Sequence, residues 1–337
     1  MIRANSILHS LLKQMKKFSL VISLMVLGHV MAAVCTAEPL TKVSLVPQWI
    51  PQAQFAGYMM ALEKGFYRDA GLDLTLLRGG PDNLPFEALS SGRATFCTGW
   101  LSTGIQQRSG GIRVINLGQI VQRSALMLIA KKSSGITSPL ELHGKRVGLW
   151  EGDFRIQPLA FFRRNNLMVE MVPLYSTANL FLKGGVDAMS AMWYNEYHTI
   201  LNCGLNEDEL TFFFLSDFGL NFPEDGIYCL EDTYRADPKA CERVVEASLK
   251  GWLYAFEHQD ETLNVVMKYC DEAHTGTNRA HQKWMLARMK DLILPNGDKS
   301  GLGKLKPRDY SRVAGILLDL NLINHIPPIA EFYRGSK

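Results

Sequence analysis

The stretch Val43–Tyr67, which reads VSLVPQWIPQAQFAGYMMALEKGFY, predicts a strand, a loop and a helix in direct succession. Residues 43–46 favour a strand, and Pro47 and Pro51 end it because a proline has no backbone N–H to donate. Beyond the loop, apolar residues recur at the spacing of one helix face, at Phe55, Met59, Leu62 and Phe66. Gly65 stands where helices commonly end.

The loop of this unit carries the first candidate ligand contacts. In open α/β sheets, ligands bind where the carboxyl end of a strand meets the amino end of a helix. Trp49 is therefore either a ligand contact or a core residue of the loop, and the spacing leaves both open. Three glutamines share its position and are candidates with it: Gln48, Gln52 and Gln54.

Strand and helix patterns continue to alternate after this unit, which predicts an α/β fold with two mostly parallel sheets flanked by helices. In the first half we expect strands at 72–77, 94–98, 112–117 and 126–130, and helices at 84–89 and 101–108. In the second half we expect a strand ending at Trp150, strands near 169–172, 187–190 and 211–215, and helices at 156–164 and 177–182. A helical C-terminal segment follows, at 240–257, 261–269, 278–290 and 308–320.

These patterns divide the chain into a leader and two lobes. We expect residues 38–130 together with 229–337 to form the first lobe, and residues 131–228 to form the second. The lobes share a short motif, because Leu89-x-x-Gly92 and Leu182-x-x-Gly185 are each followed by a strand and, eight residues after the glycine, by a tryptophan. The motif predicts a duplicated architecture in which Trp100 and Trp193 face a shared crevice, unless two common turns coincide by chance.

Residues 1–37 have the pattern of a secretory signal peptide. The only charges are basic, at Arg3, Lys13, Lys16 and Lys17, and the apolar run 18–34 ends in small residues before Ala37. We therefore expect cleavage after Ala37 and a periplasmic location. The apolar run is close to the lower length limit for a membrane span, so an uncleaved anchor is the alternative.

Charge and cysteine content exclude several classes of protein. Removing the 4 basic residues of the leader from 36 leaves 32 Lys and Arg against 33 Asp and Glu, a net charge of −1. A role on nucleic acid or on an anionic membrane surface thus lacks its electrostatic basis. The remaining cysteines contain no C-x-x-C pair, which argues against a zinc or redox centre but leaves room for one disulfide: Cys97, Cys203, Cys229, Cys241 and Cys270.

Catalytic motifs are absent from the sequence. It contains no G-x-S-x-G, H-E-x-x-H, P-loop or G-x-G-x-x-G pattern. We therefore predict neither an enzyme nor a cofactor. His198 alone among the histidines is next to a candidate site, in a structural or a catalytic role, whereas we expect four others to be solvated on the C-terminal helices: His258, His274, His281 and His325.

The segment Trp193-Tyr194-Asn195-Glu196-Tyr197 is the second candidate binding loop. Its aromatic rings can stack on a planar nitrogen heterocycle, each worth roughly 0.5–1.5 kcal/mol beyond area burial. The carboxylate of Glu196 can accept a hydrogen bond from an exocyclic amine. The alternative is that Tyr194 and Tyr197 belong to the core and that Glu196 caps a helix. Three further residues are expected to line the site or to act as hinges: Gln119, Trp150 and Asp225.

Two segments carry a resemblance to a known family. The sequence W-x-P-Q-A-Q-F-A-G-Y, followed by E-K-G-F-Y, resembles the periplasmic substrate-binding proteins of the pyrimidine-precursor and thiamine-synthesis type, as does the N-E-Y at Asn195. The resemblance implies a bilobed type II periplasmic-binding-protein fold, a thiamine-related aminopyrimidine as ligand, an ABC permease as partner and a monomer. It also adds Tyr58, within the first segment, to the ligand contacts.

The same superfamily offers other functions for this fold. Its members include binding proteins for alkanesulfonates and nitrate, bilobed receptors can also report to a sensor kinase, and one eukaryotic branch is a pyrimidine synthase. That branch uses a histidine and a cysteine-rich segment, but here Thr103 stands at the histidine position and no cysteine cluster lies between Cys203 and Cys229. We therefore expect no synthase activity.

Overall fold

The computed structural model describes residues 39–175 and 177–335. The predicted signal peptide lies outside the described residues. Within them, no helix combines the length and the apolar character needed to cross a membrane.

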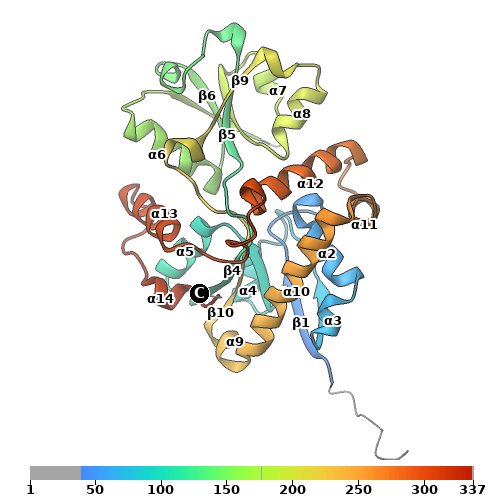
Figure 1. The fold of residues 1–337 in the computed structure, drawn as a ribbon. Helices are drawn as coiled ribbons and strands as arrows, with labels where there is room; N and C mark the ends of the chain where they lie inside the picture. Colours follow the sequence, from blue (N-terminus) through green and yellow to red (C-terminus); the bar gives the residue numbers. More distant parts are fainter. Residues whose placement is uncertain (1–38, 176, 336–337) are drawn as a thin grey trace, which may run out of the picture. The chain divides into compact units, whose positions relative to one another are not determined.

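The described residues from Thr41 onward form one compact unit that contains two sheets (Figure 1). The first sheet has the strand order β2-β1-β3-β10-β4. Its strands are β1 (Thr41–Val46), β2 (Leu72–Leu76), β3 (Phe96–Gly99), β4 (Val114–Gln119) and β10 (Gly226–Leu230). Strand β1 pairs in parallel with β2 and β3, whereas β10 runs antiparallel to β3 and β4.

The second sheet repeats this arrangement, with the order β7-β6-β8-β5-β9. Its strands are β5 (Leu126–Lys131), β6 (Arg146–Trp150), β7 (Glu170–Leu174), β8 (Ala188–Met192) and β9 (Leu210–Phe214). Strand β6 pairs in parallel with β7 and β8, and β5 is antiparallel to β8 and β9. The predicted duplicated α/β architecture is therefore confirmed. Each sheet is mixed, because one strand in its fourth position runs against the others.

The two reversed strands are those that follow the crossings between the sheets. The chain leaves the first sheet after Gln119 and returns to it at Gly226. The expected limits of the lobes, 130 and 229, come later than these changes of sheet, because an apolar strand pattern does not indicate which sheet the strand joins. The division into two domains stays a prediction.

Helices flank both sheets (Figure 1). The α-helices are α2 (Ala56–Glu63), α3 (Phe66–Asp69), α4 (Pro85–Ser90), α5 (Leu101–Ser109), α6 (Ile156–Arg164), α7 (Asn179–Leu182), α8 (Glu196–Asn202), α9 (Glu231–Ala236), α10 (Pro238–Glu257), α11 (Gln259–Glu272), α12 (Arg279–Ile293), α13 (Pro307–Asp319) and α14 (Ile329–Phe332). Short 3₁₀ turns are η1 (Ala53–Phe55), η2 (Lys132–Ser134), η3 (Pro139–Leu142), η4 (Gly152–Arg155), η5 (Glu207–Glu209), η6 (Leu215–Phe218) and η7 (Pro295–Gly297).

The helix predicted from Phe55 to Phe66 is interrupted at Gly65. This glycine has a φ of +74°, a left-handed conformation that separates α2 from α3. The motif shared by the two lobes also needs a correction. Gly92 follows α4 with a φ of +75°, but its counterpart after α7 is Gly184, with a φ of +74°, and not Gly185. The interval from glycine to tryptophan is therefore one residue longer in the second lobe.

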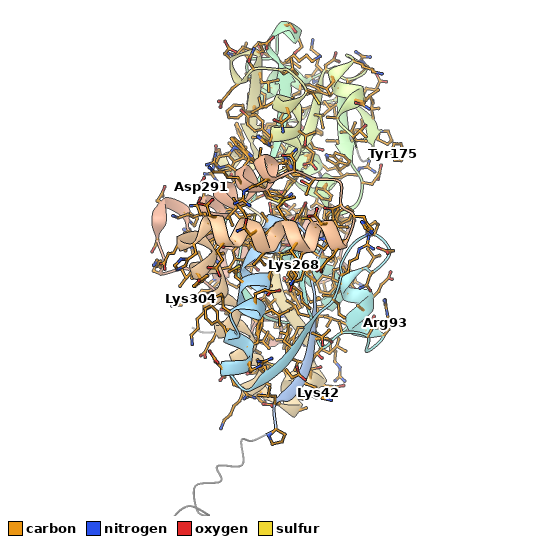
Figure 2. The ribbon with its side chains drawn as sticks, turned by 90° about the vertical axis from the view of Figure 1, so that its right-hand side faces the viewer. Lys42, Arg93, Tyr175, Lys268, Asp291 and Lys304 are labelled. Carbon is orange, nitrogen blue, oxygen red and sulfur yellow. The ribbon has the colours of Figure 1, made fainter. Side chains whose placement is uncertain are left out.

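The C-terminal helices α10 and α11 pack against α2, the helix that follows the first strand. On α10, Gly251 faces Gly57 of α2, and Trp252 packs edge-on against the buried Tyr58 ring at 5.8 Å. Lys268 of α11, which is labelled in Figure 2, pairs with Glu63 of α2 at 3.1 Å. Segments about two hundred residues apart in the sequence thus share one core.

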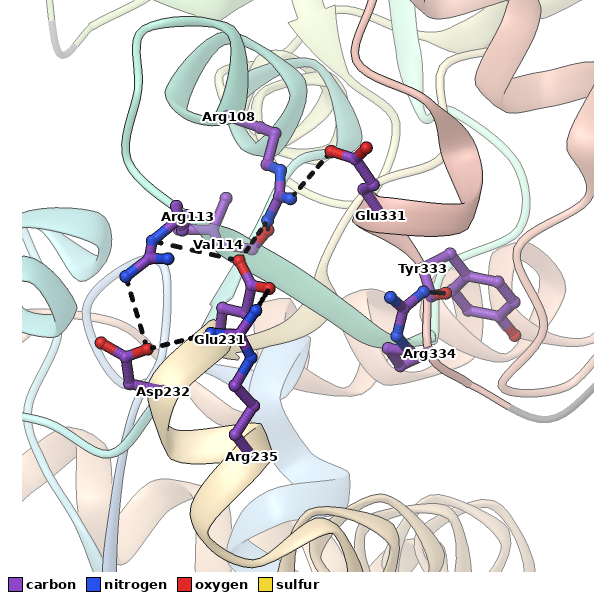
Figure 3. Close-up of polar contacts among 9 residues, drawn as sticks. All are labelled: Arg108, Arg113, Val114, Glu231, Asp232, Arg235, Glu331, Tyr333 and Arg334. Atoms are coloured by element: carbon purple, nitrogen blue, oxygen red, sulfur yellow. Dashed lines mark hydrogen bonds and ion pairs between the residues drawn. The ribbon is translucent and has the colours of Figure 1, made fainter.

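A network of ion pairs joins α5, α9 and α14 (Figure 3). Arg108 of α5 contacts Glu231 at 3.5 Å and Glu331 at 3.3 Å, and Arg235 contacts Glu231 at 2.6 Å. The side chains of Arg108 and Glu231 are only 10% and 16% exposed, so solvent screens this pair less than an open surface pair.

The α2–α10 contact depends on the absence of a side chain at Gly251. A Cβ there would lie 2.0 Å from the Gly57 carbonyl oxygen. We expect Gly251→Ala to lower the free energy of unfolding by about 1–3 kcal/mol, because the helices would have to separate. Urea denaturation measures this change.

Gly315→Ala is the matched control, since Gly315 lies within α13 and its Cβ would meet nothing within 4 Å. This variant should gain roughly 0.5–1 kcal/mol from helix propensity. Equal stability of the two variants would contradict the close helix crossing.

Candidate functional site

The two crossings between the sheets lie side by side and hold each other in place. The Gln119 side chain donates to the Glu224 carbonyl, and Asn221 accepts from the Ser124 N–H at 2.9 Å and donates to the Gln122 carbonyl at 3.1 Å. Backbone groups that leave their sheets are thereby satisfied by side chains of the other crossing. Gln119 thus holds the backbone of Glu224, and its expected role in lining the site stays a prediction.

Glu224 is buried at this point, with 2% of its surface exposed. Its Oε1 atom accepts hydrogen bonds from the Ser124 hydroxyl at 2.9 Å and from the Ala125 N–H at 2.7 Å. Its Oε2 atom is buried and has no hydrogen-bond partner among the described residues. Burial, reinforced by the neighbouring Asp225, raises the pKa of Glu224 to about 8.

Asp225 repeats this arrangement from the next position. It is 2% exposed, and its Oδ2 accepts from the Gln54 amide at 2.6 Å, while Oδ1 is buried without a partner in the described part of the chain. Gln54 in turn accepts from Gln52 at 2.6 Å. Burial raises the pKa of Asp225 to about 7. The backbone at Asp225 has a φ of +42°, so the turn that aims this carboxyl is strained.

Two tyrosines are within electrostatic range of this acid pair, Glu224 and Asp225. Tyr58 on α2 and Tyr194 after β8 are both buried. Burial raises the pKa of both phenols, with the charge of Asp225 adding to the shift of Tyr58 and the charges of Glu224 and Asp225 to that of Tyr194. The site therefore combines two carboxyls with aromatic side chains from the helices and loops of both sheets.

The acid pair is suited to a ligand that donates hydrogen bonds. Buried polar atoms in folded proteins are almost always bonded, and an unbonded one costs about 1–3 kcal/mol. Two free oxygens on adjacent residues therefore favour a donor-rich group between them. Among residues 39–175 and 177–335, no cluster of three or more His, Cys, Asp or Glu side chains could hold a metal ion.

The second predicted loop, residues 193–196, is held mainly by its own neighbours. Glu196 accepts from the Met192 N–H at 2.8 Å and from the Asn195 amide at 2.9 Å, at the start of α8. These contacts hold the carboxylate within its own loop without capping α8, which has no side-chain cap hydrogen bond, and a ligand contact for Glu196 stays a prediction. The Trp193 ring, expected to stack on a ligand, contacts Phe214 at 5.3 Å and the Arg288 guanidinium at 4.6 Å.

The other predicted tryptophans differ in their surroundings. Trp49 is 41% exposed, whereas Trp100 is 3% exposed and packs edge-on against Phe154 at 4.6 Å. The Trp150 indole N–H donates to the Ser190 carbonyl of β8 at 2.9 Å, so its polar group is bonded within the second sheet. Gln48 donates its N–H to Thr98 at 2.9 Å. A ligand contact for these residues stays a prediction.

A polar bridge links the two lobes at the start of α5. Asp153 of η4 accepts from Ser102 at 3.2 Å, from Gln106 at 3.1 Å and from the Thr103 hydroxyl. Thr103, which stands where the synthase branch has a histidine, is thus a structural contact between the lobes.

Comparison with solved structures defines the class of fold. The aliphatic sulphonate binding protein SsuA from Escherichia coli superimposes with a TM-score of 0.68, at 12% identity over 88% of this chain and 93% of that one. The protein therefore has the fold of periplasmic binding proteins. Residues 52–262 match the family described as NMT1/THI5 like, and the chain belongs to this family.

Two relatives by sequence carry names of binding proteins. The formylaminopyrimidine-binding protein of Halalkalibacterium halodurans is 21% identical over 86% of this chain and 90% of its own length. The riboflavin-binding protein RibY of Chloroflexus aurantiacus is 22% identical over 71% of this chain and 70% of its own. Both relatives are named for a planar nitrogen heterocycle.

Sequence reasoning missed Glu224 and named Asp225 only as lining or hinge. The signal that could have found the pair is the sequence Pro-Glu-Asp-Gly directly before an apolar strand, since two acids seldom precede a buried strand without a partner. Their hydrogen-bond donors, 99 and 171 residues away, carry no mark in the sequence.

The raised pKa values predict how stability depends on pH. Both carboxyls hold a proton more tightly in the folded protein than in the unfolded chain, so stability falls as the pH rises from about 4 to about 8. Glu224→Gln removes one such group and still offers an acceptor to Ala125. We expect it to raise the free energy of unfolding at pH 8 by about 1–3 kcal/mol and to change it little at pH 5.

Urea denaturation across this pH range tests the expectation. Asp208→Asn, which makes the same change of charge at an exposed position, should leave the pH profile unaltered. If the free energy of unfolding of Glu224→Gln depends on pH in the same way as that of the unaltered protein, Glu224 ionises in the folded protein at no cost in stability, and the expectation is wrong.

Proposed function

We propose that this protein is an extracytoplasmic solute receptor that binds a small planar amine between its two sheets and delivers it to an ABC permease. The observation that carries the proposal is the pair of free, buried carboxyl oxygens on Glu224 and Asp225. A thiamine-related aminopyrimidine supplies the matching donors, and the name of the Halalkalibacterium halodurans relative supports this ligand class. The predicted signal peptide supports the location.

The charge of the site separates this ligand from a sulfonate. A sulfonate carries a fixed negative charge and only acceptor oxygens, so it would oppose ionisation of the two buried carboxyls and could not donate to their free oxygens. An aminopyrimidine instead donates through its amine and presents a ring face to Tyr58 or Tyr194. The likeness to sulfonate-binding proteins therefore concerns the fold and not the ligand.

Binding without turnover is the activity that these residues support. The synthase alternative requires a histidine where this chain has Thr103, and that hydroxyl donates to Asp153. A hydroxyl of this kind does not titrate near neutral pH and supplies no ring nitrogen. We therefore expect the receptor to close on its ligand and release it unchanged, the hinge motion typical of such folds.

A calorimetric screen of the mature chain tests the ligand class. We expect thiamine-related pyrimidines such as formylaminopyrimidine to bind and alkanesulfonates and nitrate not to bind. Asp225→Asn should weaken the pyrimidine about 10- to 100-fold, the range for loss of a charged hydrogen bond. Asp208→Asn is the control and should bind normally. Preference for a sulfonate, or an unchanged affinity in folded Asp225→Asn, would refute the amine site.

Mass analysis of the recovered ligand tests the absence of catalysis. The protein is incubated with the pyrimidine that binds best, with and without ferrous iron and pyridoxal phosphate. We expect ligand and protein masses to be unchanged in both cases. A new pyrimidine product, or loss of mass from a histidine side chain, would identify an enzyme instead.

A further inference from the structure

Two buried glutamines of the opening loop form a chain of hydrogen bonds that ends at Asp225. Gln52 Nε2 donates to Gln54 Oε1 at 2.6 Å, and Gln54 Nε2 donates to Asp225 Oδ2 at 2.6 Å. The two glutamines are 7% and 4% exposed. Groups so deeply buried have few alternative arrangements, because an amide that turned would lose a hydrogen bond that water could not replace.

The backbone of this loop is held by other contacts. Gln282 of α12 is buried and accepts from the Ala53 N–H at 2.6 Å. The Phe55 N–H donates to the Gln52 carbonyl at 2.9 Å, which closes the turn η1. The turn is therefore fixed by contacts that do not involve the side-chain amides of Gln52 and Gln54.

The direction of the Gln54 amide decides which form of Asp225 is stabilised. An amide has N–H donors at one end and a carbonyl acceptor at the other. Because the Gln54 carbonyl accepts from Gln52, its N–H end faces the carboxyl. An N–H donor stabilises an ionised carboxylate, whereas a carbonyl in its place would stabilise the protonated acid. Oδ2 of Asp225 is thus an acceptor, and Oδ1, which has no partner among the described residues, is the oxygen that carries the proton when the carboxyl is neutral.

The neighbours of Asp225 do not favour its ionisation. Four titratable side chains interact with it electrostatically: Glu224, Tyr58 of α2, Tyr194 after β8 and Tyr228 of β10. Burial raises the pKa of the three phenols, so they are neutral near pH 7, and burial together with Asp225 raises the pKa of Glu224 to about 8. Burial also raises the pKa of Asp225 to about 7, and the hydrogen bond from Gln54 opposes this shift.

We propose that Gln52 and Gln54 are positioning residues for Asp225. Gln52 fixes the direction of the Gln54 amide, and the Gln54 N–H favours the ionised carboxylate and leaves Oδ1 free to accept from a donor of the ligand. Neither glutamine needs to touch the ligand in this role. The effect of the two residues on ligand affinity rests on the proposed function, whereas their effect on the ionisation of Asp225 does not.

Titration of the Asp225 carboxyl carbon by carbon-13 NMR in the ligand-free mature chain tests this role. Gln54→Met removes the donor and keeps the length of the side chain, so we expect the midpoint to rise by about one to two pH units. Gln52→Met leaves Gln54 in place but frees its amide to turn its carbonyl toward the protonated acid. The midpoint should then rise by about one pH unit.

Gln282→Met is the matched control, because Gln282 is also buried and supports the same turn through the Ala53 N–H. This variant should lower the stability to urea without moving the midpoint of Asp225. If Gln54→Met does not fold, Gln52→Met carries the test. An unchanged midpoint in folded Gln52→Met, or an equal rise in Gln282→Met, would overturn the proposal.

Affinity for formylaminopyrimidine, measured at neutral and alkaline pH, is the second readout. We expect Gln52→Met to weaken binding about fivefold to tenfold at neutral pH and less at alkaline pH, because alkali restores the ionised Asp225 that accepts from the ligand. A loss of affinity of equal size at every pH would assign Gln52 to direct ligand contact and overturn the positioning role. A midpoint that moves as expected in a protein that binds no pyrimidine supports the positioning role and refutes the proposed function.

Discussion

Two carboxyl groups buried at the point where the chain returns to its first sheet constrain the architecture of this protein. Taking Glu224 and Asp225 out of water is unfavourable unless donors meet them, and the donors come from the other crossing, at Ser124 and Ala125, and from Gln54 in the opening loop. The crossings must therefore lie against each other. The reversed strands β5 and β10, which follow them, then occupy equivalent positions in the two sheets.

Two contacts of different character join elements that pack on different sheets. Around Asp153, the donors of α5 make a compact polar contact between the lobes. At α12, His281 and Trp284 contact His198 of α8, whose ring stacks on Trp284. The half-satisfied acid pair Glu224 and Asp225 is costly to bury, as expected of a site in which the ligand completes the hydrogen bonds. Stability and binding are thus set by the same few groups.

The sequence was sufficient for most of the elements and for their duplication, because both depend on local periodicity, but it missed strand β10 and helices α9 and α14. The helices from Pro238 onward and the tryptophans after β3 and β8 are where the pattern predicts them. Contacts between side chains far apart in the sequence could not be predicted from this periodicity. His281 was expected to be solvated, and it instead reaches Asn195, 86 residues away. Glu196 was expected to meet an amine, and its contacts to Met192 and Asn195, which lie in its own loop, were not foreseen.

The apolar run that forms β5 shows the same limit, because its periodicity is identical whichever sheet it joins. The sheet that β5 joins is set by the hydrogen bonds at the two crossings, and the apolar periodicity of the strand carries no information about it. The shared motif of glycine and tryptophan was also predicted only approximately. Gly184, and not Gly185, adopts the left-handed conformation that matches Gly92. Residue spacing located the repeat correctly but misplaced its register by one position.

The most direct test of this account is the protonation state of the acid pair with and without ligand. Carbon-13 chemical shifts of the Glu224 and Asp225 carboxyl carbons, assigned with Glu224→Gln and Asp225→Asn, report it at pH 6. The account predicts protonated carboxyls in the free protein and a shift of both carbons toward the ionised position when the best-binding pyrimidine saturates the site. Saturated binding that leaves both resonances unchanged would contradict it.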